Sequence, residues 1–250
     1  MKKGLLLIDR GSREKEVQDE LRYICEKAKA RGGYLFSDYC FLEVIPPYIE
    51  DGMRKCFGQD IEALTIVPYF LYPGRKVKAA VNMAVEFKPM NKIKIAISKP
   101  MSFHKLMVRI VDERIGSTLA KNKISLSKKE VDVLLIGHGS KDPEARTSLK
   151  YVVDELKHQY RDIGYCFLEI EQPNISQGIE ECAKKSPEIL IVVPYFLHKG
   201  AHVKRDIYED LNPAIEKSKI KNIFITEHLG TDDKLVDLVV ERAREAENDY

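Results

Sequence analysis

The sequence has no excess of one charge, no long apolar run and no paired cysteine motif. Its 250 residues include 41 basic and 39 acidic side chains, so neither a charged disordered tail nor an extended nucleic-acid-binding face is indicated. The longest apolar stretch, residues 189–197, contains a proline and falls far short of the roughly 20 residues of a membrane-spanning helix. The five cysteines form no C-x-x-C pair, which argues against a disulfide framework and a zinc site. We therefore expect a soluble, cytoplasmic protein that binds neither nucleic acid nor membrane.

The second half of the chain repeats the first at an offset of 126–128 residues. Tyr-Cys-Phe-Leu-Glu stands at 39–43 and again at 165–169, and Val-Pro-Tyr-Phe-Leu stands at 67–71 and again at 193–197. Further identities keep the same order across the half-chain, which is the signature of an internal repeat. We predict two homologous domains, residues 1–118 and 131–250, with a polar seam near residues 116–130.

Each half alternates apolar, β-branched segments with amphipathic ones. Strands are expected at 4–8, 61–67 and 92–97 and at 131–136, 189–193 and 222–226, with a further strand in each half that ends in Phe-Leu-Glu. Helices are expected at about 14–30, 48–57, 76–85 and 103–115, and at about 144–160, 175–184, 202–210 and 233–245. This alternation predicts an α/β fold, a tandem pair of domains, each a four-stranded parallel sheet flanked by helices, with strand order 2-1-3-4.

Chemistry-bearing side chains follow the strands where that order reverses, which is where such sheets bind ligands. In the second half, His138 follows strand 1, His202 follows strand 3, and strand 2 leads to Glu169. Two imidazoles and a carboxylate suit a divalent metal such as Fe²⁺, Co²⁺ or Ni²⁺. We predict that His138 and His202 bind metal. Glu169 has two alternatives, a catalytic role or a structural one, because the first half retains the equivalent Glu43.

The first half has cations where the second has histidines. Arg10 stands at the position of His138, and Lys76 stands at the position of His202. Arginine and lysine are protonated at neutral pH and do not bind a metal cation. We expect the two halves to face each other across a cleft, with Arg10 and Lys76 holding an anionic substrate. The alternative is that both are relics on a solvated surface.

Three motifs stand in a fixed order along the second half. They are Gly-His-Gly-Ser at 137–140, Phe-Leu-Glu at 167–169, and Val-Pro-Tyr-Phe-Leu at 193–197 followed by Gly-Ala-His-Val at 200–203. Together they resemble the sirohydrochlorin chelatases, the class II chelatases that insert Fe²⁺ or Co²⁺ into sirohydrochlorin for siroheme or cobalamin synthesis. The resemblance covers nearly the whole chain. Two-domain members often keep the histidines in the amino-terminal domain, which here has Arg10 and Lys76.

The resemblance implies that His138 and His202 bind metal and accept pyrrole protons, with Glu169 assisting. It implies no tightly bound cofactor, because the metal is a substrate, and it names the anionic tetrapyrrole sirohydrochlorin as partner. Lys199 and Lys204 flank the histidine loops and, with Arg10 and Lys76, would bind substrate carboxylates.

The sequence does not carry the motifs of two other enzyme classes. A histidine phosphatase would need adjacent Arg and His, and a nucleophile elbow would need Gly-x-Ser-x-Gly; neither is present. A tetrapyrrole or metal carrier without turnover remains the alternative.

Overall fold

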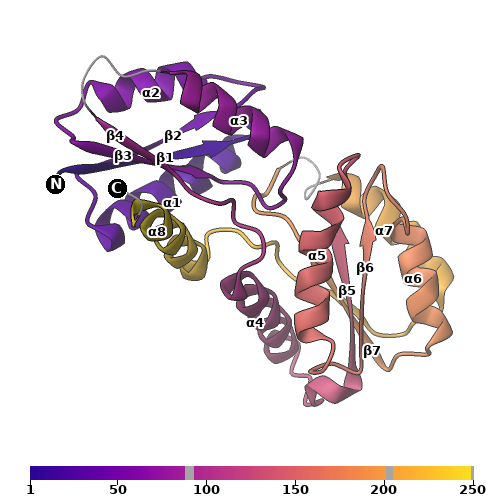
Figure 1. Cartoon of the computed structure of the whole chain (residues 1–250). Helices are drawn as coiled ribbons and strands as arrows, with labels where there is room; N and C mark the ends of the chain where they lie inside the picture. Colours follow the sequence, from indigo (N-terminus) through magenta and orange to yellow (C-terminus); the bar gives the residue numbers. More distant parts are fainter. Residues whose placement is uncertain (88–92, 201–204, 249–250) are drawn as a thin grey trace. The chain divides into compact units, whose positions relative to one another are not determined.

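The chain forms two compact units in a computed structural model that describes residues 1–87, 93–200 and 205–248. The first unit comprises Met1–His104 and Thr231–Tyr250, and the second comprises Lys105–Gly230. Each unit contains one four-stranded parallel sheet flanked by helices (Figure 1). The predicted fold class is therefore confirmed. No helix in the described ranges is long and apolar enough to cross a membrane.

The first sheet has the order β2-β1-β3-β4, as predicted. Its strands are β1 (Lys3–Asp9), β2 (Phe36–Phe41), β3 (Ala63–Pro68) and β4 (Lys94–Ile97). The helices of this unit are α1 (Lys15–Gly32), α2 (Ile49–Phe57), α3 (Arg75–Glu86) and α8 (Asp233–Glu247). Every residue of β3 is buried, as expected for a central parallel strand with helices on both faces.

The second sheet repeats this topology as β6-β5-β7-β8. Its strands are β5 (Val131–Gly137), β6 (Asp162–Phe167), β7 (Ile189–Pro194) and β8 (Ile223–Ile225). The helices of this unit are α4 (Lys105–Lys121), the 3₁₀ turn η1 (Lys128–Glu130), α5 (Pro143–Leu156), α6 (Ile175–Lys184) and α7 (Ile207–Ser218). The helix expected at 202–210 begins in residues outside the described ranges, and α7 continues eight residues beyond its expected end.

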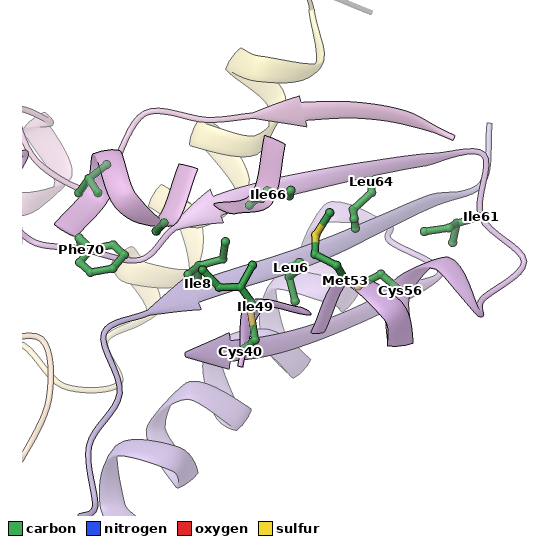
Figure 2. Close-up of a cluster of buried hydrophobic side chains, with 13 residues drawn as sticks. Leu6, Ile8, Cys40, Ile49, Met53, Cys56, Ile61, Leu64, Ile66 and Phe70 are labelled. Carbon is green, nitrogen blue, oxygen red and sulfur yellow. The ribbon is translucent and has the colours of Figure 1, made fainter. Parts of the chain in front are cut away.

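The core of the first unit is apolar on the face of the sheet that α2 covers. Figure 2 shows Met53 and Ile49 of α2 lying against Leu6 of β1 and Leu64 of β3. All four side chains are buried, and the second unit has the equivalent cluster around Leu134. This close packing of helix against sheet fixes the positions of the strands, and therefore also the positions at which the loops after the strands begin.

The last helix of each sequence repeat belongs to the other unit. Helix α4 packs on α5 and β7 of the second unit, whereas α8 packs on α1, β3 and β4 of the first. The predicted boundaries, 1–118 and 131–250, therefore differ from the compact units. The physical reason is that an amphipathic helix buries its apolar stripe on whichever sheet face is open to it, and the order of segments along the chain does not select that face.

The seam expected at residues 116–130 is also shorter than expected. Helix α4 continues through Gly116 to Lys121. It does so because Leu119 is buried one turn after the buried Ile115, so the apolar stripe continues into the polar-looking segment.

Candidate functional site

The predicted site residues of the first unit stand in the connections that follow three adjacent strands, with Lys76 in the first turn of α3, the helix after β3. Arg10 follows β1 directly and His138 follows β5 directly, while Glu43 and Glu169 stand two residues beyond β2 and β6. Because β1 and β5 lie between their neighbours in each sheet, the three loops of a unit adjoin. The strand-end rule therefore places these side chains as the sequence predicts.

In the second unit, the structure brings His138 and Glu169 together. His138 Nε2 lies 3.3 Å from Glu169 Oε1, and the backbone N–H of Glu169 donates to the carbonyl oxygen of His138 over 3.0 Å. The His138 side chain is 21% exposed and the Glu169 side chain is 49% exposed. The pair is thus held by the backbone yet remains open to solvent on the carboxylate side.

The surroundings of His138 orient its ring. Its Nδ1 lies 3.2 Å from the carbonyl oxygen of Gly139, which can only accept, so Nδ1 carries the hydrogen in this contact. The ring also packs on Phe196, with centroids 6.4 Å apart. A neutral imidazole with hydrogen on Nδ1 has its lone pair on Nε2, facing the Glu169 carboxylate. This position therefore favours a proton or a metal cation.

Two predicted residues, His202 and Lys204, lie outside the described residues. Lys199 is exposed in the loop after β7. Within residues 1–87, 93–200 and 205–248, no group of three or more His, Cys, Asp or Glu side chains forms a metal site. In that part of the chain, the second unit offers the pair His138 and Glu169 as donors.

In the first unit, the equivalent carboxylate is held by two cations. Arg10 Nε lies 3.0 Å from Glu43 Oε1, and Lys76 Nζ lies 2.6 Å from Glu43 Oε2. The hydrogen bond from Lys76 and then that from Arg10 lower the pKa of Glu43. Both carboxylate oxygens are engaged, so Glu43 is the centre of a salt-bridged cluster in this unit. The structure thus explains how Arg10 and Lys76 fit at positions equivalent to histidines.

Both units need a glycine where the loop after strand 1 crosses the loop after strand 2. Gly11 and Gly139 have φ of 103° and 93°. A Cβ atom would lie 2.2 Å from the carbonyl oxygen of Glu43 at the first position and 1.8 Å from that of Glu169 at the second. The shared structural role of the two glutamates therefore includes their backbone, which packs on these glycines.

The residue after each glutamate closes a tight turn. Val44 and Ile170 have φ of 78° and 69°, and the next N–H donates to the glutamate carbonyl oxygen over 3.0 and 2.7 Å respectively. These are γ-turns of the rare, strained kind, each centred on a β-branched side chain that is exposed. The strain is thus located beside the site in both units.

Sequence analysis missed two residues that hold the second-unit loops. Glu171 accepts the backbone N–H of Ser140 over 3.0 Å and pairs with Arg146 Nε over 2.6 Å. The loop amide is therefore bound by Glu171, and the carboxylate of Glu169 faces His138. A signal was present in the repeat, because the first half has the apolar Ile45 at the position of the charged Glu171, beside the predicted site.

Comparison with known proteins identifies the family of the chain. The CbiX family matches the chain twice, over residues 4–118 and 132–246. The sirohydrochlorin ferrochelatase of Priestia megaterium is 26% identical over 94% of this chain and 87% of its own length. The sirohydrochlorin cobaltochelatase of the same organism is 24% identical over 97% of this chain and 79% of its own length.

A solved structure shows the same fold. SirB from Bacillus subtilis with Fe³⁺ superposes with a TM-score of 0.81 at 24% identity, covering 100% of this chain and 97% of that one. The two family matches together span nearly the whole chain, and they coincide with the repeat and the two sheets. The chain therefore belongs to the CbiX/SirB family of class II chelatases, with two family domains in tandem.

Proposed function

We propose that this protein is a sirohydrochlorin chelatase that inserts a divalent metal, Fe²⁺ or Co²⁺, into sirohydrochlorin, with its working site in the second unit. The observation that carries the proposal is the pairing of His138 Nε2 with Glu169 Oε1 at 3.3 Å. The relatives named as ferrochelatase and cobaltochelatase support the same substrate class with both metals.

The reaction exchanges two pyrrole protons for one metal dication. His138 Nε2 can hold the metal or accept a proton, because the same imidazole lone pair can take either one. Glu169 Oε1 is close enough to receive that proton, and its exposed side passes it to water. The proposal assigns His202 as the second metal ligand and second proton acceptor.

Substrate binding is assigned to cationic side chains of both units. Lys199 and Lys204 of the second unit and Arg10 and Lys76 of the first are proposed to bind the carboxylates of the tetrapyrrole. Since Arg10 and Lys76 already share Glu43, substrate would compete with that carboxylate. We therefore expect Arg10→Ala to raise KM about tenfold, a loss of about 1.4 kcal/mol, with little change in kcat.

Glu43→Gln is the informative companion to that variant. It frees both cations from their internal partner, so KM should fall if they bind substrate. If Arg10→Ala, Lys76→Ala and Glu43→Gln all leave KM and its salt dependence unchanged, the first unit does not bind substrate.

The proposal is tested by metalation under anaerobic conditions. Purified protein and excess sirohydrochlorin receive Fe²⁺, Co²⁺ or Ni²⁺ separately, and absorption is followed over many turnovers. We expect His138→Ala to lower kcat by about a hundredfold or more, within the range for loss of a proton-transfer group. His158→Ala, which removes an exposed histidine after α5, serves as the matched control.

The competing function is a carrier. A protein that binds sirohydrochlorin tightly and metalates it no faster than the spontaneous reaction with any metal would be a carrier and would overturn the chelatase proposal.

A further inference from the structure

The carboxylate of Glu171 is nearly enclosed and bridges two loops of the second-unit site. Its side chain is 9% exposed, and its two oxygens accept from Ser140 N at 3.0 Å and from Arg146 Nε at 2.6 Å. Arg146, in α5, is itself held in place: its guanidinium lies over the Phe167 ring at 5.5 Å, and its Nη2 donates to the carbonyl oxygen of Gln172 at 3.4 Å. Arg146 therefore contacts Glu171, Phe167 and Gln172 at the same time, and these contacts restrain the position of the Glu171 carboxylate.

This bridge joins the same two loops that carry His138 and Glu169. Ser140 is two residues beyond His138, and Glu171 is two residues beyond Glu169 across the γ-turn at Ile170. The same two loops are also joined by the hydrogen bond from Glu169 N to the carbonyl oxygen of His138. With both connections made, the two loops are held against each other, so the backbone positions from which the His138 and Glu169 side chains extend are restrained.

The first unit lacks this bridge and has a different way to hold its glutamate. By the repeat offsets, Ile45 stands at the position of Glu171 and Gln18 at the position of Arg146. There the Glu43 carboxylate is fixed directly by Arg10 and Lys76. In the second unit, the Glu169 carboxylate is half exposed. The loop that carries it is held by Glu171, on the far side of the γ-turn at Ile170.

We propose that Glu171, supported by Arg146, is a positioning residue of the second-unit site that holds Glu169 and His138 at the spacing needed to bind a divalent metal. The inference rests on the proposed function for its role in turnover. The effect of Glu171 on metal binding can be measured without the proposed reaction, because the affinity for a metal alone depends on the spacing of His138 and Glu169. Residues that orient metal ligands typically change metal affinity or activity by about 10–100-fold when replaced.

The test compares Co²⁺ affinity, kcat and KM for sirohydrochlorin in full-length variants. Glu171→Ile introduces the first-unit residue and should weaken Co²⁺ binding by about 10–100-fold and lower kcat, with KM little changed. Glu171→Gln keeps an oxygen that can accept from Ser140 N and loses the charge that pairs with Arg146. Its Co²⁺ affinity and kcat should therefore fall less than those of Glu171→Ile. Glu155→Gln is the control, because Glu155 is an exposed carboxylate on α5, the helix that carries Arg146. Its Co²⁺ affinity, kcat and KM should match those of the wild type.

A double variant separates positioning from folding. Glu171→Ile leaves Arg146 without its carboxylate and should lower the melting temperature for that reason alone. Glu171→Ile with Arg146→Gln recreates the first-unit pair without an unpaired charge. We expect the double variant to regain the melting temperature but not the Co²⁺ affinity. Recovery of both would show that Glu171 only stabilises the fold and would overturn the inference.

The remaining outcomes are also decisive. Folded Glu171→Ile with the Co²⁺ affinity and kcat of Glu155→Gln overturns the positioning role. Wild-type protein that binds Co²⁺ but does not accelerate metalation overturns the proposed function, and weaker Co²⁺ binding by Glu171→Ile would still support the positioning role. Wild-type protein that binds no Co²⁺ overturns the positioning role, and the proposed function is then decided separately by whether the protein accelerates insertion of Fe²⁺.

Discussion

Lys76 Nζ lies 2.6 Å from Glu43 Oε2 in the first unit, and this contact occupies a carboxylate whose second-unit counterpart, Glu169, faces a histidine. Arg10 engages the other oxygen of Glu43. The first unit therefore retains the carboxylate of the second unit at the same place after strand 2, with cations where the second half of the sequence has histidines.

Replacing both cations by histidine should create a metal site in the first unit. Arg10→His with Lys76→His removes two positive charges, frees Glu43, and supplies two imidazoles at the positions that contact Glu43. We expect this variant to bind one more equivalent of Co²⁺ than the wild type, measured by calorimetric titration. Arg10→Gln with Lys76→Gln frees Glu43 without adding ligands and is the control. Equal stoichiometry in all three proteins would contradict the equivalence of the two sites.

Gly139→Ala should destabilise the second unit. The new Cβ would overlap the carbonyl oxygen of Glu169, a backbone atom that cannot rotate away, and the backbone φ of 93° is unfavourable for alanine. We expect a loss of about 2–4 kcal/mol in the free energy of unfolding, measured by urea denaturation. Gly116→Ala is the matched control. Gly116 lies inside α4, and a Cβ added there would meet no heavy atom within 4 Å outside the backbone of its own helix. Its free energy of unfolding should rise by about 0.5–1 kcal/mol. A Gly139→Ala protein as stable as the wild type would mean that the two loops do not pack as described.

Glu247 should be a main anchor of α8 in the first unit. Its side chain is 7% exposed and accepts from Lys3 Nζ at 2.6 Å, Tyr34 Oη at 2.8 Å and Thr65 Oγ1 at 2.8 Å. Glu247→Ala removes the common acceptor of three donors, and we expect it to cost about 2–4 kcal/mol of unfolding free energy. Arg244→Ala, at an exposed position on the same helix, should change stability by less than about 0.5 kcal/mol. Similar values for the two variants would show that α8 is held by its apolar face alone.

The stability of the protein should fall as the pH drops below the ordinary pKa of histidine, because of His104. Burial and then the positive charge of Arg242 lower the pKa of His104, while Glu241 and Glu245 oppose this shift. Since the unfolded chain keeps a histidine pKa of ~6.5, it binds more protons than the folded chain below that pH. The contribution is therefore complete above about pH 6.5 and decreases as the pH falls through that value.

Urea midpoints measured from about pH 5 to pH 8 test this dependence. His104→Gln should flatten the slope below about pH 6.5, and His158→Gln, at an exposed position, should keep the wild-type slope. An unchanged slope in His104→Gln would assign the pH dependence to other groups.

Much of the site could be predicted because its signals are local. Alternating apolar periodicity identifies strands and helices, and the repeat supplies two independent copies of each element. His138 and Glu169 follow strands that the sheet order makes neighbours, so their proximity follows from topology alone.

The amino-acid sequence by itself determined the two parallel sheets, their strand order and the difference between the histidine-bearing and the cation-bearing half, because each depends on residue type and spacing within a short segment. Only the tertiary structure decided which sheet each terminal helix covers, how Arg10 and Lys76 share Glu43, and that Glu171 and Arg146 join two loops. These features depend on side chains that are distant in sequence meeting in space. A periodic pattern shows that a helix has an apolar face, but only packing determines the partner of that face.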